Sequence, residues 1–352
     1  MHNVNCNIDD YVIMLPQARK LHDLYINTIW GDVRITSNVE NAAYAIASSR
    51  SISDHPKNMQ NIVGNITIIL EENAMVVQNI TDVKFLRKDD SRYIPGVENT
   101  VYYSADNKTE FYIYQYPFKG FVMNDIENSS GAVVSSALGS LNNLSRFLFK
   151  KIMIRKYISN GYNSLHASAV EKDGYSYIFL AGGRAGKSTM FMNLILNGFN
   201  PINDDVVFVK RDSDSITCHG ITMLPSVRKE SLEYLPPFID STTNYHRGFE
   251  GEYYCDLPYQ TSNNKLDMHK LKAIFIPKYG YDNLVVEKAS DEVAKKYIIK
   301  SMNTHQELFP DNESLIIVNC LLSLPIFTIK TTADGIKNFN GFVDFLSNGI
   351  IN

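Results

Sequence analysis

The chain has little cysteine and a single tryptophan among its 352 residues. Its four cysteines, Cys6, Cys218, Cys255 and Cys320, are far apart, and none forms a C-x-x-C pair or another spacing typical of a zinc site. Scattered cysteines in a chain of this length are typical of reduced thiols. We therefore expect a cytoplasmic protein that is not built on a disulfide framework.

Long apolar runs and an excess of positive charge are also missing. No stretch approaches the roughly 20 apolar residues of a membrane-spanning helix, and no basic region followed by an apolar one suggests a signal peptide. The formal net charge of −4 gives no basic field that would attract nucleic acid. Hydrophobic residues make up 44% of the chain and charged residues 20%, which is typical of globular proteins, and the length favours two domains.

The most informative segment is residues 177–189, where an apolar, β-rich run enters a glycine-rich turn that ends in Gly-Lys-Ser-Thr and opens a helical pattern. This layout is typical of a phosphate-binding loop, in which backbone N–H groups and a helix N-terminus surround an anion. The first position of the pattern G-x-x-x-x-G-K-[ST] is alanine instead of glycine. The predicted nucleotide-binding residues are Ala181, Gly182, Gly183, Arg184, Ala185, Gly186, Lys187, Ser188 and Thr189.

Two residues of this loop have specific predicted roles. Lys187 would reach the β- and γ-phosphates of a nucleotide, and the Ser188 hydroxyl would bind Mg²⁺. The alternative is a glycine-rich turn that binds nothing. The strand pattern before the loop and the helical pattern after it favour the nucleotide site.

An acidic pair, Asp204-Asp205, follows the predicted helix and stands directly before the apolar strand Val206–Val209. Carboxylates at a strand edge near a phosphate loop hold Mg²⁺ or orient a nucleophile in nucleotide enzymes. The alternative is a polar turn, which aspartate also favours. The strand–loop–helix–strand order favours the functional interpretation.

The chain before the loop divides into two regions. Residues 1–130 are predicted to form a β-rich domain that could bind substrate, and residues 131–160 a linking helix. Asn38–Ile46 fits a short helix. The expected strands are Tyr11–Leu15, Asn61–Leu70, Ala74–Val77, Val83–Leu86 and Phe111–Tyr116.

Residues 161–352 are predicted to form the nucleotide domain. Residues 236–265 are rich in Pro, Tyr, Asn, Ser and Thr and are expected to be a long loop of the kind that forms lids or binds substrates. The other expected elements are strands at Tyr177–Leu180, Ile216–Leu224, Leu271–Ile276 and Pro325–Lys330, and helices at 187–197, Ala289–Ser301 and Gly335–Leu346.

Three motifs in order resemble the HPr kinase/phosphorylase family: His166-Ala-Ser-Ala-Val, the loop Ala181–Thr189, and Asp204-Asp205-Val-Val. Weaker similarity to its smaller relatives, including the kinases encoded beside lasso peptide and other modified-peptide genes, continues through Leu224–Arg228 and Leu271–Ile276. The resemblance implies an α/β fold with an HPr-kinase-like, phosphoenolpyruvate-carboxykinase-like P-loop domain. A β-rich α+β domain would precede it.

The resemblance also implies roles for individual residues. Lys187 would neutralise the phosphates, Ser188 and Asp205 would hold Mg²⁺, and Asp204 would orient or deprotonate the attacking hydroxyl. His166 would lie near the γ-phosphate or the acidic pair, and its alternative is a histidine satisfied within a buried strand. Arg228 would be a second cation on the transferring phosphoryl group, and its alternative is a plain surface arginine.

The chain departs from the family at several positions. Ala181 and Arg184 each replace a loop glycine, and Thr189 stands where the family often has glutamate. The glycine-rich signature that follows the acidic pair in true HPr kinases is missing. The resemblance therefore does not extend to HPr as the substrate or to phosphorylase activity.

These observations predict an ATP- and Mg²⁺-dependent kinase that phosphorylates a serine or threonine hydroxyl of a peptide or small protein, in the context of peptide modification. One alternative is a non-catalytic nucleotide-binding regulatory module, and another is a phosphoenolpyruvate-carboxykinase-like enzyme. We expect no nucleic-acid or membrane partner. The sequence does not decide whether the protein forms a homo-oligomer.

Overall fold

A computed structural model describes fifteen stretches of the chain that divide into two compact units. Unit 1 comprises residues 1–153 and 246–251, and unit 2 comprises residues 154–245 and 252–352. The described residues are 21–47, 51–70, 87–89, 98–103, 108–116, 120–182, 187–213, 215–221, 223–228, 245–247, 252–255, 268–281, 283–303, 311–331 and 339–346. Three expected strands, at 11–15, 74–77 and 83–86, lie outside them.

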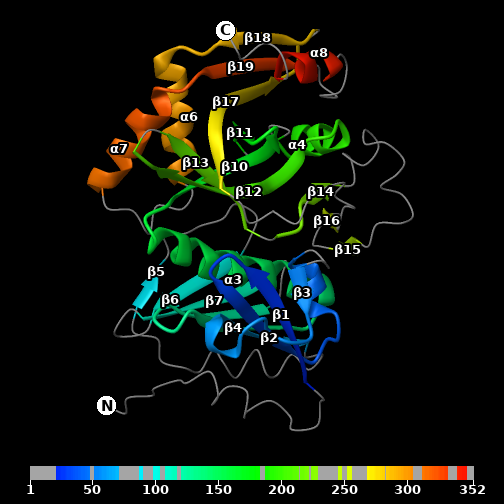
Figure 1. The fold of residues 1–352 in the computed structure, drawn as a ribbon. Coiled ribbons are helices and arrows are strands. Elements are labelled where there is room, and N and C mark those ends of the chain that lie inside the picture. Colours follow the sequence, from blue (N-terminus) through cyan, green and yellow to red (C-terminus); the bar gives the residue numbers. More distant parts are fainter. Residues whose placement is uncertain are drawn as a thin grey trace. The chain divides into compact units, whose positions relative to one another are not determined.

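Unit 1 is built on a nine-stranded mixed sheet (Figure 1). β2 and β4 pair in parallel, as do β4 and β9, and the other neighbours are antiparallel. The strand order is β3 (Ile52–Ser53), β1 (His22–Thr28), β2 (Gly31–Ser37), β4 (Ile62–Leu70), β9 (Ser130–Ser135), β8 (Gly120–Asp125), β7 (Thr109–Tyr116), β6 (Glu98–Tyr103) and β5 (Arg87–Asp89).

The described part of unit 1 also contains short 3₁₀ helices and a long α-helix. The 3₁₀ helices are η1 (Ala42–Ala45) and η3 (Met59–Asn61), and the first of them lies within the predicted helix at 38–46. The long helix, α3 (Leu138–Ile158), packs on the sheet where glycines leave room for it. A Cβ on Gly120 would lie 2.3 Å from a Leu144 methyl group, and one on Gly131 would lie 2.8 Å from a Leu148 methyl group.

The predicted linking helix at 131–160 is wrong in its first turns. Val133 and Val134 belong to β9 and pair with strands on both sides, which suits their β-branched side chains. The Ser135 hydroxyl accepts a hydrogen bond from the Ala137 N–H at the point where the strand ends. The helix therefore begins at Leu138, and the boundary between the units falls within it, after Met153.

Unit 2 contains a seven-stranded mixed sheet in the order β11 (Tyr175–Phe179), β10 (Asn163–Lys172), β12 (Asn200–Arg211), β13 (Ile216–His219), β17 (His269–Tyr279), β19 (Ile326–Thr331) and β18 (Val285–Lys288). β17 also pairs with β11, so β10 to β13 and β17 form a closed ring of pairings. The β11–β17 and β17–β19 pairs are parallel. Both units are thus mixed α/β structures.

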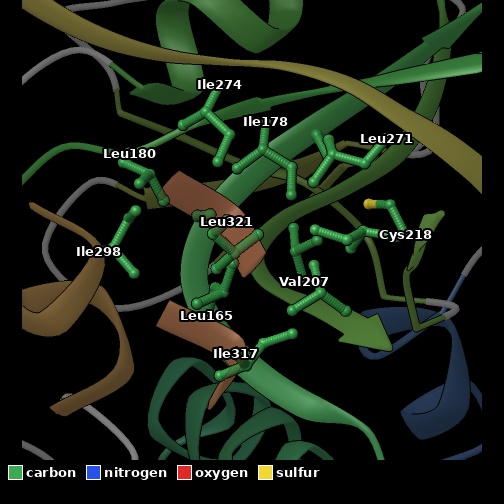
Figure 2. Close-up of a cluster of buried hydrophobic side chains, with 14 of the residues drawn as sticks. Leu165, Ile178, Leu180, Val207, Cys218, Leu271, Ile274, Ile298, Ile317 and Leu321 are labelled. Carbon is green, nitrogen blue, oxygen red and sulfur yellow. The ribbon is translucent and has the colours of Figure 1, made fainter. Parts of the chain in front are cut away.

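Helices cover both faces of this sheet. In Figure 1, α6 (Asp291–Asn303) and α7 (Asp311–Leu322) lie on one side and α4 (Lys187–Leu196) on the other. A short helix, α8 (Phe339–Asp344), adds Phe342 to the core on the α4 side. Figure 2 shows side chains from the strands meeting α6 and α7 in the opposite core, with Ile298, Ile317 and Leu321 supplied by the helices.

The helix at 187–197 and the strands around 178, 207, 274 and 328 agree with the sequence prediction. The strand expected at 216–224 ends earlier, at His219. The loop expected at 236–265 contains two short strands, β15 (Tyr245–Arg247) and β16 (Glu252–Cys255), and the rest of it lies outside the described residues. β16 pairs with β14 (Ser226–Arg228) in a small antiparallel sheet.

The core between the sheet and α7 provides a stability test with an internal control. Leu321 is fully buried and Leu315, on the same helix, is 59% exposed. Leu321→Ala should lower the free energy of unfolding by about 2–5 kcal/mol, because it removes buried methyl groups and leaves a cavity. Leu315→Ala should change it by less than about 0.5 kcal/mol. Urea denaturation measures both, and equal effects would contradict the described core.

Candidate functional site

The start of α4 lies at the end of β11, as the phosphate-loop pattern predicts. The Leu180 N–H donates to the Phe275 carbonyl and carries the pairing with β17 one residue past β11. Ala181 is buried, and α4 begins with Lys187 and Ser188. The middle of the loop, Gly183, Arg184, Ala185 and Gly186, lies outside the described residues.

The Lys187 ammonium is buried and has three hydrogen-bond partners. It donates to the Ala181 carbonyl at 3.0 Å, to the Gly182 carbonyl at 3.3 Å and to Nε2 of His166 at 3.3 Å. Burial lowers the pKa of Lys187, and the nearby carboxylates of Asp204 and Asp205 partly offset this effect. The lysine ammonium is thus held against the first two residues of the loop.

His166, on β10, connects Lys187 to the acidic pair. Its Nδ1 lies 3.1 Å from Oδ1 of Asp205, while its Nε2 faces the Lys187 ammonium. Because an ammonium can only donate, Nε2 must accept, and Nδ1–H then donates to the carboxylate. These neighbours assign His166 as the neutral Nδ1–H tautomer.

The backbone of His166 is held from the other direction by α6. The pairing of β10 with β11 ends at Ser168 and Phe179. Beyond that point the His166 carbonyl accepts a hydrogen bond of 3.0 Å from the Ser301 hydroxyl of α6. The position of this histidine therefore depends on β10, α4 and α6 together.

Asp204 is a buried carboxylate, 6% exposed. It accepts a hydrogen bond of 2.6 Å from the Ser168 hydroxyl and another from Ser188. Burial raises the pKa of Asp204 despite these hydrogen bonds and the charge of Lys187, and the neighbouring Asp205 raises it further. The group is therefore a better proton acceptor than an ordinary aspartate.

The two carboxylates reach the same face of the sheet because the backbone of β12 is irregular. Asp204 pairs with Ser168 and Asp205 with Ala167, whose side chain belongs to the core under α6 and α7. In a regular strand Asp205 would point to that core. Its φ is 111°, which non-glycine residues rarely adopt, and its carboxylate contacts His166 instead.

The prediction that the acidic pair precedes a strand is therefore wrong. Both residues lie inside β12, which begins at Asn200. The tertiary pairing with β10 keeps this polar segment extended, although aspartate by itself favours turns.

Two residues that the sequence did not single out support this irregularity. The Asn203 side chain accepts from the Asp204 N–H and donates to the Val206 carbonyl, so it brackets Asp205 on both sides. Gly220 packs on the segment before the acids: a Cβ there would lie 2.2 Å from the Ile202 carbonyl oxygen. An asparagine and a glycine carry no sequence signal for such roles.

The remaining predicted residues are placed only in part. Thr189 lies in the first turn of α4. Arg228 lies in β14, with its backbone paired opposite Glu252. Its guanidinium group is not among the described side chains, so its role as a second cation stays a prediction.

The oxygen-rich set at this site has the right chemistry for Mg²⁺, which binds carboxylate and hydroxyl oxygens. Ser188 and Asp205 were predicted to hold it, and the structure gives Ser188 a hydrogen bond to Asp204. Within the described stretches, no group of three or more His, Cys, Asp or Glu side chains could hold a metal.

None of the described helices is long and apolar enough to cross a membrane.

The chain matches no protein-family model and no curated protein. Among solved structures, it is similar to the HPr(Ser) kinase/phosphatase from Coxiella burnetii at 13% sequence identity, over 53% of this chain and 94% of that chain, with a TM-score of 0.28. A likeness this low does not establish a shared fold.

The raised pKa of Asp204 predicts an unusual pH dependence of stability. Between the unfolded pKa of about 3.9 and the higher folded pKa, the folded state binds more protons than the unfolded state, so stability falls as pH rises. Asp204→Asn removes this loss and keeps a group that Ser168 can contact. The variant should match wild type near pH 4 and become the more stable of the two towards pH 7.

Chemical denaturation across this pH range measures the difference. A stability difference that is independent of pH, or one that favours wild type increasingly towards pH 7, would show that burial does not dominate at Asp204.

Proposed function

We propose that unit 2 is an ATP- and Mg²⁺-dependent kinase of the HPr-kinase-like P-loop type. It would transfer the γ-phosphoryl group to a serine or threonine hydroxyl of a peptide or small protein, with unit 1 contributing to substrate binding. The observation that carries the proposal is the buried Asp204 carboxylate beside Lys187 and Ser188 at the N-terminus of α4.

The positive groups at this site are suited to a nucleotide phosphate. The N-terminus of α4 has ten residues of aligned backbone dipoles behind it. The Lys187 ammonium now donates to two carbonyls at the start of the loop. Phosphate oxygens carry full negative charge and are stronger acceptors, so a bound nucleotide would attract this ammonium.

Asp204 has the features of a general base for a hydroxyl acceptor. As the acceptor oxygen bonds to the transferring phosphorus, the bond to the leaving ADP breaks and the hydroxyl proton passes to the Asp204 carboxylate. The higher pKa of this group brings it closer to the pH at which a base is effective. In a loose transition state the proton moves late, so orientation of the hydroxyl comes first.

Asp205 and His166 would position other groups of the site. Ser188 and Asp205 would supply oxygen ligands for Mg²⁺, which would neutralise charge on the phosphate oxygens. Nδ1–H of His166 fixes the Asp205 carboxylate, and Nε2 of the same ring receives Lys187. One neutral imidazole thereby sets the separation between the predicted metal ligand and the phosphate-binding lysine.

A non-catalytic nucleotide-binding module would need Lys187 and Ser188 but not Asp204. Keeping an aspartate where its charge is desolvated costs folding stability. Binding alone would not favour that cost, whereas proton transfer requires the group. This contrast favours the kinase over the binding module.

Two variants separate these functions when MgATP binding and transfer of label from radiolabelled ATP to arrayed serine and threonine peptides are both measured. Lys187→Ala should weaken MgATP binding and abolish transfer. Asp204→Asn should leave MgATP affinity within a few-fold and lower transfer by about 10²-fold or more, the usual scale for loss of a general base. Asp344→Asn, which changes an exposed carboxylate on α8, is the matched control and should leave both unchanged.

The same assays identify the alternatives. Equal MgATP binding by wild type and Lys187→Ala would end the nucleotide-site interpretation. Tight binding without transfer to any peptide would favour the regulatory module. Formation of phosphoenolpyruvate from oxaloacetate and ATP would assign the carboxykinase-like reaction instead.

A further inference from the structure

A second lysine reaches the start of the loop from a different helix. The Nζ atom of Lys300, on α6, lies 3.5 Å from the position that a Cβ on Gly182 would occupy. The carbonyl of the same Gly182 accepts a hydrogen bond from Lys187. Two ammonium groups from α4 and α6 are therefore gathered around one residue.

The two ammonium groups are close enough to repel each other. The positive charge of Lys300 acts on the neighbouring Lys187 electrostatically. Like charges held together store unfavourable energy, which a phosphate between them would relieve. The carboxylates of Asp204 and Asp205 also lie near Lys187, and each acts on its charge more strongly than Lys300 does.

The helix that carries Lys300 is fixed in place by its neighbours. Ala294, Ile298 and Met302 are buried in the core beneath the sheet, and Figure 2 shows Ile298 within it. Ser301, which directly follows Lys300 in the chain, donates a hydrogen bond from its hydroxyl to the His166 carbonyl. The backbone at Lys300 is thus held by core packing and by the strand that carries His166, while its exposed side chain extends to the loop.

We propose that Lys300 is a second phosphate-binding residue, which acts with Lys187 on the terminal phosphate of the bound nucleotide. This inference rests on the proposed nucleotide site. Both ammonium groups lie beside Gly182, and the lysine of a phosphate loop reaches the β- and γ-phosphates. Lys300 would add a second positive charge, beside that of Lys187, to stabilise the charge of the transferring group.

The test compares nucleotides that differ by one phosphate. MgATP and MgADP are titrated calorimetrically into the full chain, as wild type and as Lys300→Ala, Lys300→Arg and Lys295→Ala. Lys295 is an exposed lysine on the same helix and serves as the matched control. Inorganic phosphate is titrated separately, so that a site for free phosphate is distinguished from one for the nucleotide.

Lys300→Ala should weaken MgATP binding about tenfold, the scale of one charged hydrogen bond at an exposed site, and MgADP binding less than twofold. Lys300→Arg should restore most of the MgATP affinity because it keeps the charge, and Lys295→Ala should resemble wild type. Thermal unfolding of each variant confirms that the fold is intact, which the exposure of Lys300 favours.

Each other outcome has a distinct meaning. Wild-type MgATP affinity in Lys300→Ala overturns the inference alone, and the proposed kinase stands. Equal weakening of MgATP and MgADP also overturns the assignment to the terminal phosphate. Tight inorganic phosphate binding that Lys300 controls while MgATP affinity is unchanged assigns the residue to a free phosphate instead. If wild type binds no MgATP, the proposed function fails and this inference fails with it.

Discussion

The left-handed backbone of Asp205 is the constraint on which the site depends. It turns one carboxylate away from the core under α6 and α7, so that two adjacent aspartates face the same side of β12. One then reaches Ser168 and the other His166, which are two residues apart on β10. The strain is held by the Asn203 side chain on both sides of Asp205 and by the close packing of Gly220.

This geometry couples the charges of the site. Asp204 and Lys187 are both buried, and burial opposes the charged form of each, while each favours the charge of the other. Folding thus buries a carboxylate and an ammonium together, although burial of either charge alone would cost desolvation free energy. Stability given up at this position is consistent with the general observation that functional sites violate the rules that stabilise the rest of a fold.

Local patterns in the chain were informative wherever neighbouring residues decide the structure. The apolar run at 177–180 and the helical spacing after Lys187 depend on periods of two and 3.6 residues, and both elements are present. The same reasoning failed at 131–135, where β-branched residues at helical spacing form β9 instead. It failed again at Asp204-Asp205, where polar residues that favour turns are held in a strand by pairing with β10.

The sequence by itself determined which residues are candidates for the chemistry: a lysine and a serine at a helix N-terminus, an acidic pair and a histidine on a preceding strand. Only the tertiary structure decided how they meet. The tautomer of His166, the shared face of the two carboxylates and the approach of Lys300 to Gly182 depend on strand register and on the packing of α6. Contacts between residues so distant in the chain leave no periodic trace in it, because they are set by pairing and core packing and not by neighbouring residues.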